Sequence, residues 1–206
     1  MAAAHVLVPL KRLDDAKSRL AEVLGPDERA ALMLELLQGV LAALKEADVG
    51  PITVVSSEPL SPNGAARFDD CGLAWNDALA AAMREVVRAP IATIVSADQP
   101  RLTAAEVRAL VAATPDRGTA IARALDGGTN AVSMRPAGAV TTHFGEPSSA
   151  AVHAQATAAA GLAARIIDLP GLAFDVDTPA DLEELRSRPH ARSSGADGGA
   201  GPQVTV

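Results

Sequence analysis

Residues 91–97 have the sequence IATIVSA, and Asp98, Gln99 and Pro100 follow directly. A short run of apolar and β-branched residues without polar alternation is typical of a strand that is covered on both faces, as in a parallel sheet. We therefore expect a central strand here, with Asp98 at its carboxyl end. Ligands of open α/β sheets bind beside the carboxyl ends of the strands, so this acidic residue is a candidate for function.

Similar short runs recur on both sides of this segment and alternate with helical stretches. We expect further strands at residues 5–10, 52–56, 119–124, 131–135 and 164–169, and helices at residues 26–47, 77–88 and 150–161. Thr103 with Glu106 forms a capping box that starts another helix, and Thr178 with Pro179 starts the last one. This alternation predicts an α/β fold with a mostly parallel central sheet covered by helices.

The chain has 206 residues, a length that suits one domain. We expect that domain at residues 1–186. Residues 187–206 are rich in Gly, Ser and Arg and cannot build a core, so we expect a disordered tail. Charge or proline interrupts every apolar run before about 18 residues, and the first basic residues follow the apolar stretch instead of preceding it. We therefore expect a cytoplasmic protein that contacts no membrane.

The overall charge argues against a nucleic-acid partner. The net charge is −7, aromatic residues make up 2 % of the chain, and tyrosine is absent, so phosphate neutralisation and base stacking both lack residues. The single cysteine, Cys71, allows no internal disulfide or thiolate cluster, and we interpret it as a partly buried, unreactive thiol. The sequence leaves the oligomeric state open, a homodimer included.

The first candidate site is the basic segment after the first expected strand. Residues 11–20, KRLDDAKSRL, concentrate four cations in an acidic chain. If this segment is extended, Lys17 and Arg19 point the same way and could hold one polyphosphate between them. The alternative is a solvated loop whose cations pair with Asp14 and Asp15.

Carboxylates supply the second and third candidates. Asp98 is well placed for Mg²⁺, which prefers one or two protein oxygens together with substrate phosphates, but a turn aspartate before Pro100 has the same pattern. Asp175 and Asp177 have the spacing of an extended chain, so both could face a metal. Alternatively, both complement the positive end of the helix that begins at Pro179.

The fourth candidate combines a glycine turn, GGTN at residues 127–130, with the segment FGEPSS at residues 144–149. Ser148 and Ser149 stand at an expected helix start, where free backbone N–H groups bind anions. Taken alone, these segments are also consistent with an ordinary turn and an N-cap.

Other residues offer weaker signals. No metal-ligand spacing connects the histidines, which we interpret as surface or packing residues: His5, His143, His153 and His190. Trp75 and Asn76 could approach a nucleobase, although a single tryptophan is more often part of a core.

The candidate segments follow one order along the chain: VPLKRLDDAKSRL at 8–20, SADQPRLT at 96–103, GGTNAV at 127–132, FGEPSS at 144–149 and FDVDTPADLEEL at 174–185. In this order they resemble the guanylyltransferases of deazaflavin coenzyme F-420 biosynthesis, which activate 2-phospholactate or phosphoenolpyruvate. The resemblance extends over about residues 5 to 186 and implies a three-layer, Rossmann-like nucleotidyltransferase fold. Gln99 stands where the family usually has Leu, and residues 72–79 depart from its compact G-L-N-x-A-L motif.

The resemblance also implies roles for individual residues. Lys11, Lys17, Arg19 and Asn76 would contact the nucleotide, with Lys17, Arg19 and Asp98 acting in catalysis. Mg²⁺ would be held by Asp98, Asp175 and Asp177. The phospho-acid would contact Thr129, Asn130, Gly145 and Ser148.

The implied reaction transfers GMP from GTP to the phosphate of phosphoenolpyruvate or 2-phospho-L-lactate and releases pyrophosphate. Two other functions stay open from the sequence: a molybdopterin- or sugar-type nucleotidyltransferase, and a nucleotide-binding regulator without catalysis. The three carboxylates speak against the regulator.

Overall fold

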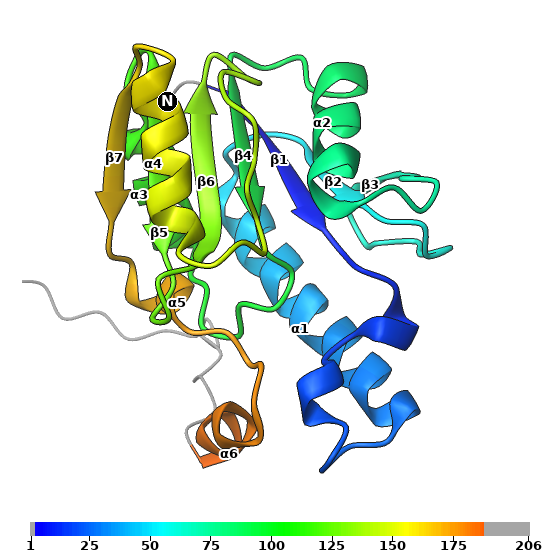
Figure 1. Ribbon diagram of the computed structural model, residues 1–206. Coiled ribbons are helices and arrows are strands. Elements are labelled where there is room, and N and C mark those ends of the chain that lie inside the picture. The colour runs from blue at the N-terminus through cyan, green and yellow to red at the C-terminus, as the bar shows by residue number, and fades with distance from the viewer. Residues whose placement is uncertain (1–2, 188–206) are drawn as a thin grey trace, which may run out of the picture.

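A seven-stranded sheet runs through residues 3–187, the part of the chain that the computed structural model describes (Figure 1). Its strands are β1 (Ala4–Pro9), β2 (Ile52–Val55), β3 (Ala66–Phe68), β4 (Ile91–Val95), β5 (Gly118–Arg123), β6 (Thr129–Arg135) and β7 (Ala163–Ile167). The spatial order is β3-β2-β1-β4-β6-β5-β7. Strand β6 is antiparallel to both of its neighbours, and the other pairs are parallel. The predicted mostly parallel sheet is confirmed.

Helices cover both faces of the sheet and make the fold three-layered, as the sequence predicted. They are α1 (Pro26–Ala47), α2 (Trp75–Glu85), α3 (Ala104–Ala113), α4 (Ser149–Ala159), α5 (Pro170–Ala173) and α6 (Pro179–Ser187). Alternate side chains of β1 point to opposite faces: Val6 and Val8 pack with α1 and α3, whereas Leu7 packs with α2 and α4. In Figure 1, α2 and α4 lie on the viewer's side of the sheet.

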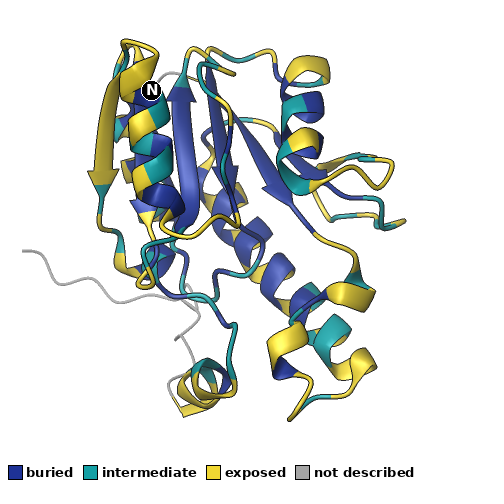
Figure 2. Ribbon diagram, viewed as in Figure 1, coloured by how far each residue is buried: buried dark blue, intermediate teal, exposed yellow. Residues whose placement is uncertain are grey.

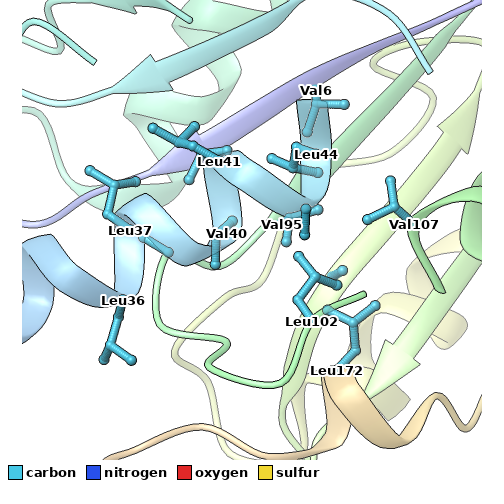
Figure 3. Close-up of a cluster of buried hydrophobic side chains, with 14 of the residues drawn as sticks. Val6, Leu36, Leu37, Val40, Leu41, Leu44, Val95, Leu102, Val107 and Leu172 are labelled. Atoms are coloured by element: carbon cyan, nitrogen blue, oxygen red, sulfur yellow. The ribbon is translucent and has the colours of Figure 1, made fainter. Parts of the chain in front are cut away.

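The larger core lies between α1 and the sheet. Apolar residues recur on α1 at helical spacing and meet side chains from β1, β4, α3 and α5, as Figure 3 shows for Leu36, Leu37, Val40, Leu41, Leu44, Val6, Val95, Val107 and Leu172. Figure 2 shows the central strands as buried along their length. Burial of each such side chain contributes roughly 1.5–3 kcal/mol. The sheet is therefore a rigid platform for the loops at its ends.

The predicted helix starts are confirmed. Pro26 occupies the first turn of α1. Thr103 Oγ1 accepts from the Glu106 backbone N–H over 3.3 Å, and Glu106 Oε2 accepts from the Thr103 N–H over 3.1 Å. Thr178 caps α6 in the same way, with Asp181 as its partner. These local signals were sufficient because the bonds join residues three positions apart.

The extended form considered for residues 11–20 is not found. Two 3₁₀ turns, Leu13–Asp15 and Ser18–Leu20, replace it, and Lys17 between them has a left-handed backbone with φ of 50°. Ala16 and Leu20 are 5 % and 0 % exposed, so their burial folds the segment back onto the core. Contrary to the prediction, Lys17 and Arg19 therefore do not lie on one side of an extended chain. Strand β3 and helix α5 were also not predicted, because both are very short.

Ser187 ends α6, and the rest of the predicted tail, residues 188–206, lies outside the described residues. Within residues 3–187, none of the helices has both the length and the apolarity needed to cross a membrane.

Candidate active site

A cleft of about 620 Å³ opens beside the carboxyl ends of β1 and β4. Its volume falls in the range of small-molecule sites. Except for Asn76, the site residues predicted from the sequence all line it: Lys11, Lys17, Arg19, Asp98, Thr129, Asn130, Gly145, Ser148, Asp175 and Asp177. Segments from both ends of the chain thus meet where ligands of open α/β sheets bind.

Three carboxylates meet on one side of this cleft. One oxygen each from Asp98, Asp175 and Asp177 lies within 4.8 Å of the other two, and this is the group that the described residues offer to a metal ion. Asp98 directly follows β4. Phe174 and Val176 are buried in the core, so the alternate side chains of Asp175 and Asp177 turn outward into the cleft.

The start of α6 is capped by Asp181 and not by the side chains of Asp175 and Asp177. The backbone N–H groups of Asp177 and Thr178 both donate to Asp181 Oδ2, over 3.1 and 2.7 Å. Asp181 therefore stabilises the positive end of this helix. The side chain of Asp177 is left for the acidic cluster.

Lys17 inserts its ammonium group between two of these carboxylates. Its Nζ lies 2.5 Å from Asp98 Oδ2 and 2.9 Å from Asp177 Oδ1, and its side chain is 4 % exposed. Burial by itself would lower the pKa of Lys17, but the charges and hydrogen bonds of Asp98 and Asp177 outweigh it and the pKa is raised. Lys17 is therefore a charged counter-ion of the cluster. Arg19 is 72 % exposed and reaches Asp177 at 3.5 Å from the solvent side.

The neighbouring like charges affect the protonation of Asp175. Burial, followed by the charges of Asp98 and Asp177, raises the pKa of Asp175 to about 6. Such crowded carboxylates are stabilised by a cation, and hard oxygen ligands suit Mg²⁺. The Lys17 ammonium already holds the place of a cation between two of them. The residues present thus fit a divalent metal ion.

An aromatic wall borders the cleft on the side of α2. Lys11 Nζ lies 4.3 Å above the Trp75 ring, which stacks on Phe144 with 6.1 Å between ring centroids. Asn76 lies behind this wall: its amide donates to the Phe144 carbonyl over 3.1 Å and accepts from the Phe144 N–H over 3.0 Å. The structure therefore places Asn76 as a support for the Phe144 segment, outside the residues that line the cleft.

Another part of the cleft lining consists of the Gly turn and the start of α4. Thr129, Gly145, Ser148 and Ser149 line it, and α4 begins at Ser149, so the predicted helix start is confirmed. Asn130 is 5 % exposed, and its amide donates to the Leu172 carbonyl over 2.9 Å. Asn130 thereby ties α5, and the acidic loop after it, to β6.

Sequence reasoning missed two buried polar groups beside these walls. Gln99 is 1 % exposed, and its Nε2 lies 3.2 Å from Asp98 Oδ1, so it contacts the carboxylate oxygen that Lys17 does not. His153 is 0 % exposed and bonds Thr129, instead of serving only as a surface or packing residue. His153 lies four positions after Ser149, a spacing that places both residues on one face of a helix, and this spacing was the available signal for His153 near the site. His190 lies outside the described residues. The predicted partial burial of Cys71 was wrong, because the residue is exposed in the loop before α2.

Solved structures with the same fold include a nucleotidyl transferase from Methanothermobacter thermautotroptrophicus. It aligns with a TM-score of 0.68 and 16 % identity over 91 % of this chain and 97 % of that one. The CMP:2-keto-3-deoxy-manno-octonic acid synthetase complexed with CTP aligns with a TM-score of 0.61 and 15 % identity, over 90 % of this chain and 98 % of that one. At these identities the likeness concerns the fold alone.

Sequence relatives are much closer. The phosphoenolpyruvate guanylyltransferase of Sphaerobacter thermophilus is 46 % identical over 188 residues, 87 % of this chain and 90 % of the relative. The 2-phospho-L-lactate guanylyltransferase of Natrialba magadii is 35 % identical over 219 residues, 98 % of this chain and 90 % of the relative. The family model described as "Guanylyl transferase CofC like" matches residues 4–192. Fold, cleft and near full-length relatives agree, and the chain belongs to the CofC-like guanylyl transferase family.

Proposed function

We propose that this protein transfers GMP from GTP to the phosphate of phosphoenolpyruvate or 2-phospho-L-lactate, with release of pyrophosphate. The observation that carries the proposal is the cluster of Asp98, Asp175 and Asp177 around the Lys17 ammonium, in a cleft of nucleotide size. Relatives named for these two activities match most of the chain, and the relative at 46 % identity is named for phosphoenolpyruvate, whereas the 2-phospho-L-lactate relatives are 35–38 % identical. Phosphoenolpyruvate is therefore the first acceptor to test.

The nucleotide belongs on the side of the cleft where the cations gather. Lys11 lies over Trp75, while Lys17 and Arg19 approach Asp177. Their charges suit a triphosphate, and the exposed guanidinium of Arg19 is free to turn toward it. Lys11 and the Trp75 ring together offer a cation and an aromatic face to the nucleoside.

The acceptor belongs against Thr129, Gly145 and Ser148. This wall offers hydroxyl and backbone donors at the start of α4, where the free N–H groups of a helix favour an anion. Neutral donors can surround both the phosphate and the carboxylate of a small phospho-acid without the bulk of arginine.

Chemistry in this cleft requires alignment and charge neutralisation. An oxygen of the acceptor phosphate attacks the α-phosphorus of GTP, the bond from that phosphorus to the bridging oxygen breaks, and pyrophosphate leaves. The acceptor oxygen is already anionic at neutral pH, so no residue has to remove a proton from it. Mg²⁺ held by Asp98, Asp175 and Asp177 would supply Lewis-acid stabilisation of the phosphate charges. Lys17 and Arg19 would bind the phosphates as charge builds on the leaving group.

Pyrophosphate release tests the proposal. The purified protein is assayed with each of the four nucleoside triphosphates, with and without phosphoenolpyruvate or 2-phospholactate, in Mg²⁺ and in EDTA. We expect release with GTP, a phospho-acid and Mg²⁺ together, and its loss in Asp98→Asn with the fold intact. Near-normal turnover of Asp98→Asn would overturn the metal assignment, and release that needs no phospho-acid would overturn the acceptor.

The product would join guanosine and the phospho-acid through a diphosphate, which suits the biosynthesis of coenzyme F-420 that the family resemblance implies. GTP and phosphoenolpyruvate are metabolites of the cytoplasm, so the proposed reaction assigns the protein to that compartment.

A further inference from the structure

A buried histidine contacts the acceptor wall from behind. His153 on α4 is 0 % exposed, and its Nδ1 lies 3.0 Å from Thr129 Oγ1. At the other side of the ring, the backbone N–H of His143 donates to Nε2 over 2.9 Å. The Phe144 ring packs against the imidazole in a T-shaped arrangement, with 5.2 Å between the centroids. The ring is therefore held through both nitrogens and by packing.

These contacts select one tautomer of His153. Because Nε2 accepts the His143 N–H, Nε2 carries no hydrogen, and the hydrogen of the neutral ring resides on Nδ1. Burial lowers the pKa of His153 to about 4, so the ring is neutral at neutral pH. His153 Nδ1–H is then a donor to the Thr129 hydroxyl.

A second donor acts on the same hydroxyl. Ser149, 1 % exposed at the start of α4, donates its own hydroxyl hydrogen to Thr129 Oγ1 over 3.1 Å. A hydroxyl oxygen has two acceptor positions, and His153 and Ser149 occupy both. Thr129 keeps its hydrogen for donation, and Thr129 is one of the residues that line the cleft.

We infer that His153 and Ser149 are positioning residues that fix the Thr129 hydroxyl as a hydrogen-bond donor to an anionic oxygen of the phospho-acid, an inference that rests on the proposed function. An anionic oxygen can only accept hydrogen bonds. A hydroxyl that rotates freely presents lone pairs to that oxygen for part of the time, whereas one with both lone pairs occupied presents hydrogen only. His153 and Ser149 thus ensure that the Thr129 hydroxyl donates its hydrogen in the acceptor site.

The test compares Michaelis constants in three variants. His153→Leu removes the donor, His153→Asn retains an N–H near the position of Nδ1, and Thr129→Val removes the hydroxyl itself at nearly constant volume. We expect Thr129→Val to raise KM for phosphoenolpyruvate roughly ten- to a hundredfold, the range expected for a hydrogen bond to a charged group, and His153→Leu to raise it by a smaller factor, because the hydroxyl remains and Ser149 still donates to it. In Thr129→Val, KM for GTP should change less than about twofold, because the nucleotide belongs beside Lys11 and Trp75. His153 packs against Phe144, which stacks on Trp75, so Thr129→Val is the decisive variant for this comparison of the two substrates. His153→Asn should recover part of the loss.

His5 provides the matched control. It is also buried, at 7 % exposure, and its Nε2 bonds a threonine, Thr53, at 2.8 Å, but neither residue lines the cleft. His5→Leu therefore reports the general cost of removing a buried histidine bonded to a threonine. We expect it to lower the melting temperature without selective change in KM for the phospho-acid.

The double variant His153→Leu/Thr129→Val should bind the acceptor about as weakly as Thr129→Val alone, because both changes remove one interaction. If His153→Leu does not fold, Ser149→Ala tests the same hydroxyl with a smaller change. An unchanged KM for the phospho-acid in folded His153→Leu and Ser149→Ala, or an equal increase of KM for both substrates in Thr129→Val, would overturn the inference. Failure of the wild type to use any phospho-acid would instead overturn the proposed function.

Discussion

Replacing Lys17 with Met removes the ammonium group from the acidic cluster and keeps most of the apolar stem. Lys17 contacts Asp98 at 2.5 Å and Asp177 at 2.9 Å, and these carboxylate side chains are 23 % and 42 % exposed. In the metal-free variant, three carboxylates would face one another with only the exposed Arg19 guanidinium near Asp177. We expect the folded protein to lose stability in EDTA and to recover it when Mg²⁺ occupies the cluster.

The size of the loss follows from the burial of the pair. Removal of one partner from a fully buried ion pair costs about 3–5 kcal/mol, and the partial solvation of the carboxylates reduces this to about 2 kcal/mol here. For a chain of this length, such a loss lowers the melting temperature by roughly 4–8 °C. Because no ammonium competes for the carboxylates, Mg²⁺ should raise the melting temperature of Lys17→Met more than that of the wild type.

The assay is thermal unfolding of both proteins in EDTA and in saturating Mg²⁺. Arg19→Met is the matched control, since its guanidinium also approaches Asp177 but is 72 % exposed, so we expect a shift of less than about 2 °C. Equal melting temperatures of Lys17→Met and the wild type in EDTA would refute the counter-ion role. An equal gain from Mg²⁺ in both proteins would refute the competition between ammonium and metal.

Three further measurements probe the same site. The pKa of Asp175 in the folded protein is raised to about 6, above its usual 3.8, so ionisation of Asp175 destabilises the fold increasingly from about pH 4 to pH 6. Asp175→Asn should therefore stabilise the metal-free protein by about 1–2 kcal/mol at pH 7 and not at pH 4. Equal effects at both pH values in denaturant titrations would contradict this. The pKa of His153 is lowered from 6.5 to about 4, so its contribution to the free energy of unfolding is present above pH 6.5 and is lost on acidification toward pH 4, by up to roughly 3 kcal/mol. His153→Leu should therefore flatten the dependence of stability on pH between pH 4 and pH 6.5. Parallel profiles of the variant and the wild type would show that His153 does not cause this dependence. A phosphate ester without a carboxylate should have a kcat/KM about tenfold to a hundredfold below that of phosphoenolpyruvate, and Ser148→Ala should reduce this difference. Equal kcat/KM values for the two acceptors in the wild type would place the acceptor against other residues.

Local chemistry made much of the fold predictable from the sequence. The apolar run at residues 91–97 indicated a strand buried on both faces, and the caps at Thr103 and Thr178 marked helix starts, because these signals act over a few residues. The same locality explains the misses. Segment 11–20 has no strong local preference, and its two turns form because Ala16 and Leu20 pack into a core built by distant elements.

Motifs in the sequence identify the candidate residues one by one, whereas only the packing of distant segments shows which of them share a cleft. Asp98, Asp175 and Asp177 could each be identified by motif, but their meeting around Lys17 depends on a sheet that pairs β4 with β1 and on the return of the chain after α5. Contacts between Lys17 and Asp98, 81 positions apart, leave no local pattern. The same holds for Asn76 with Phe144 and for His153 with Thr129, because a hydrogen bond between distant segments exists only after packing has brought them together.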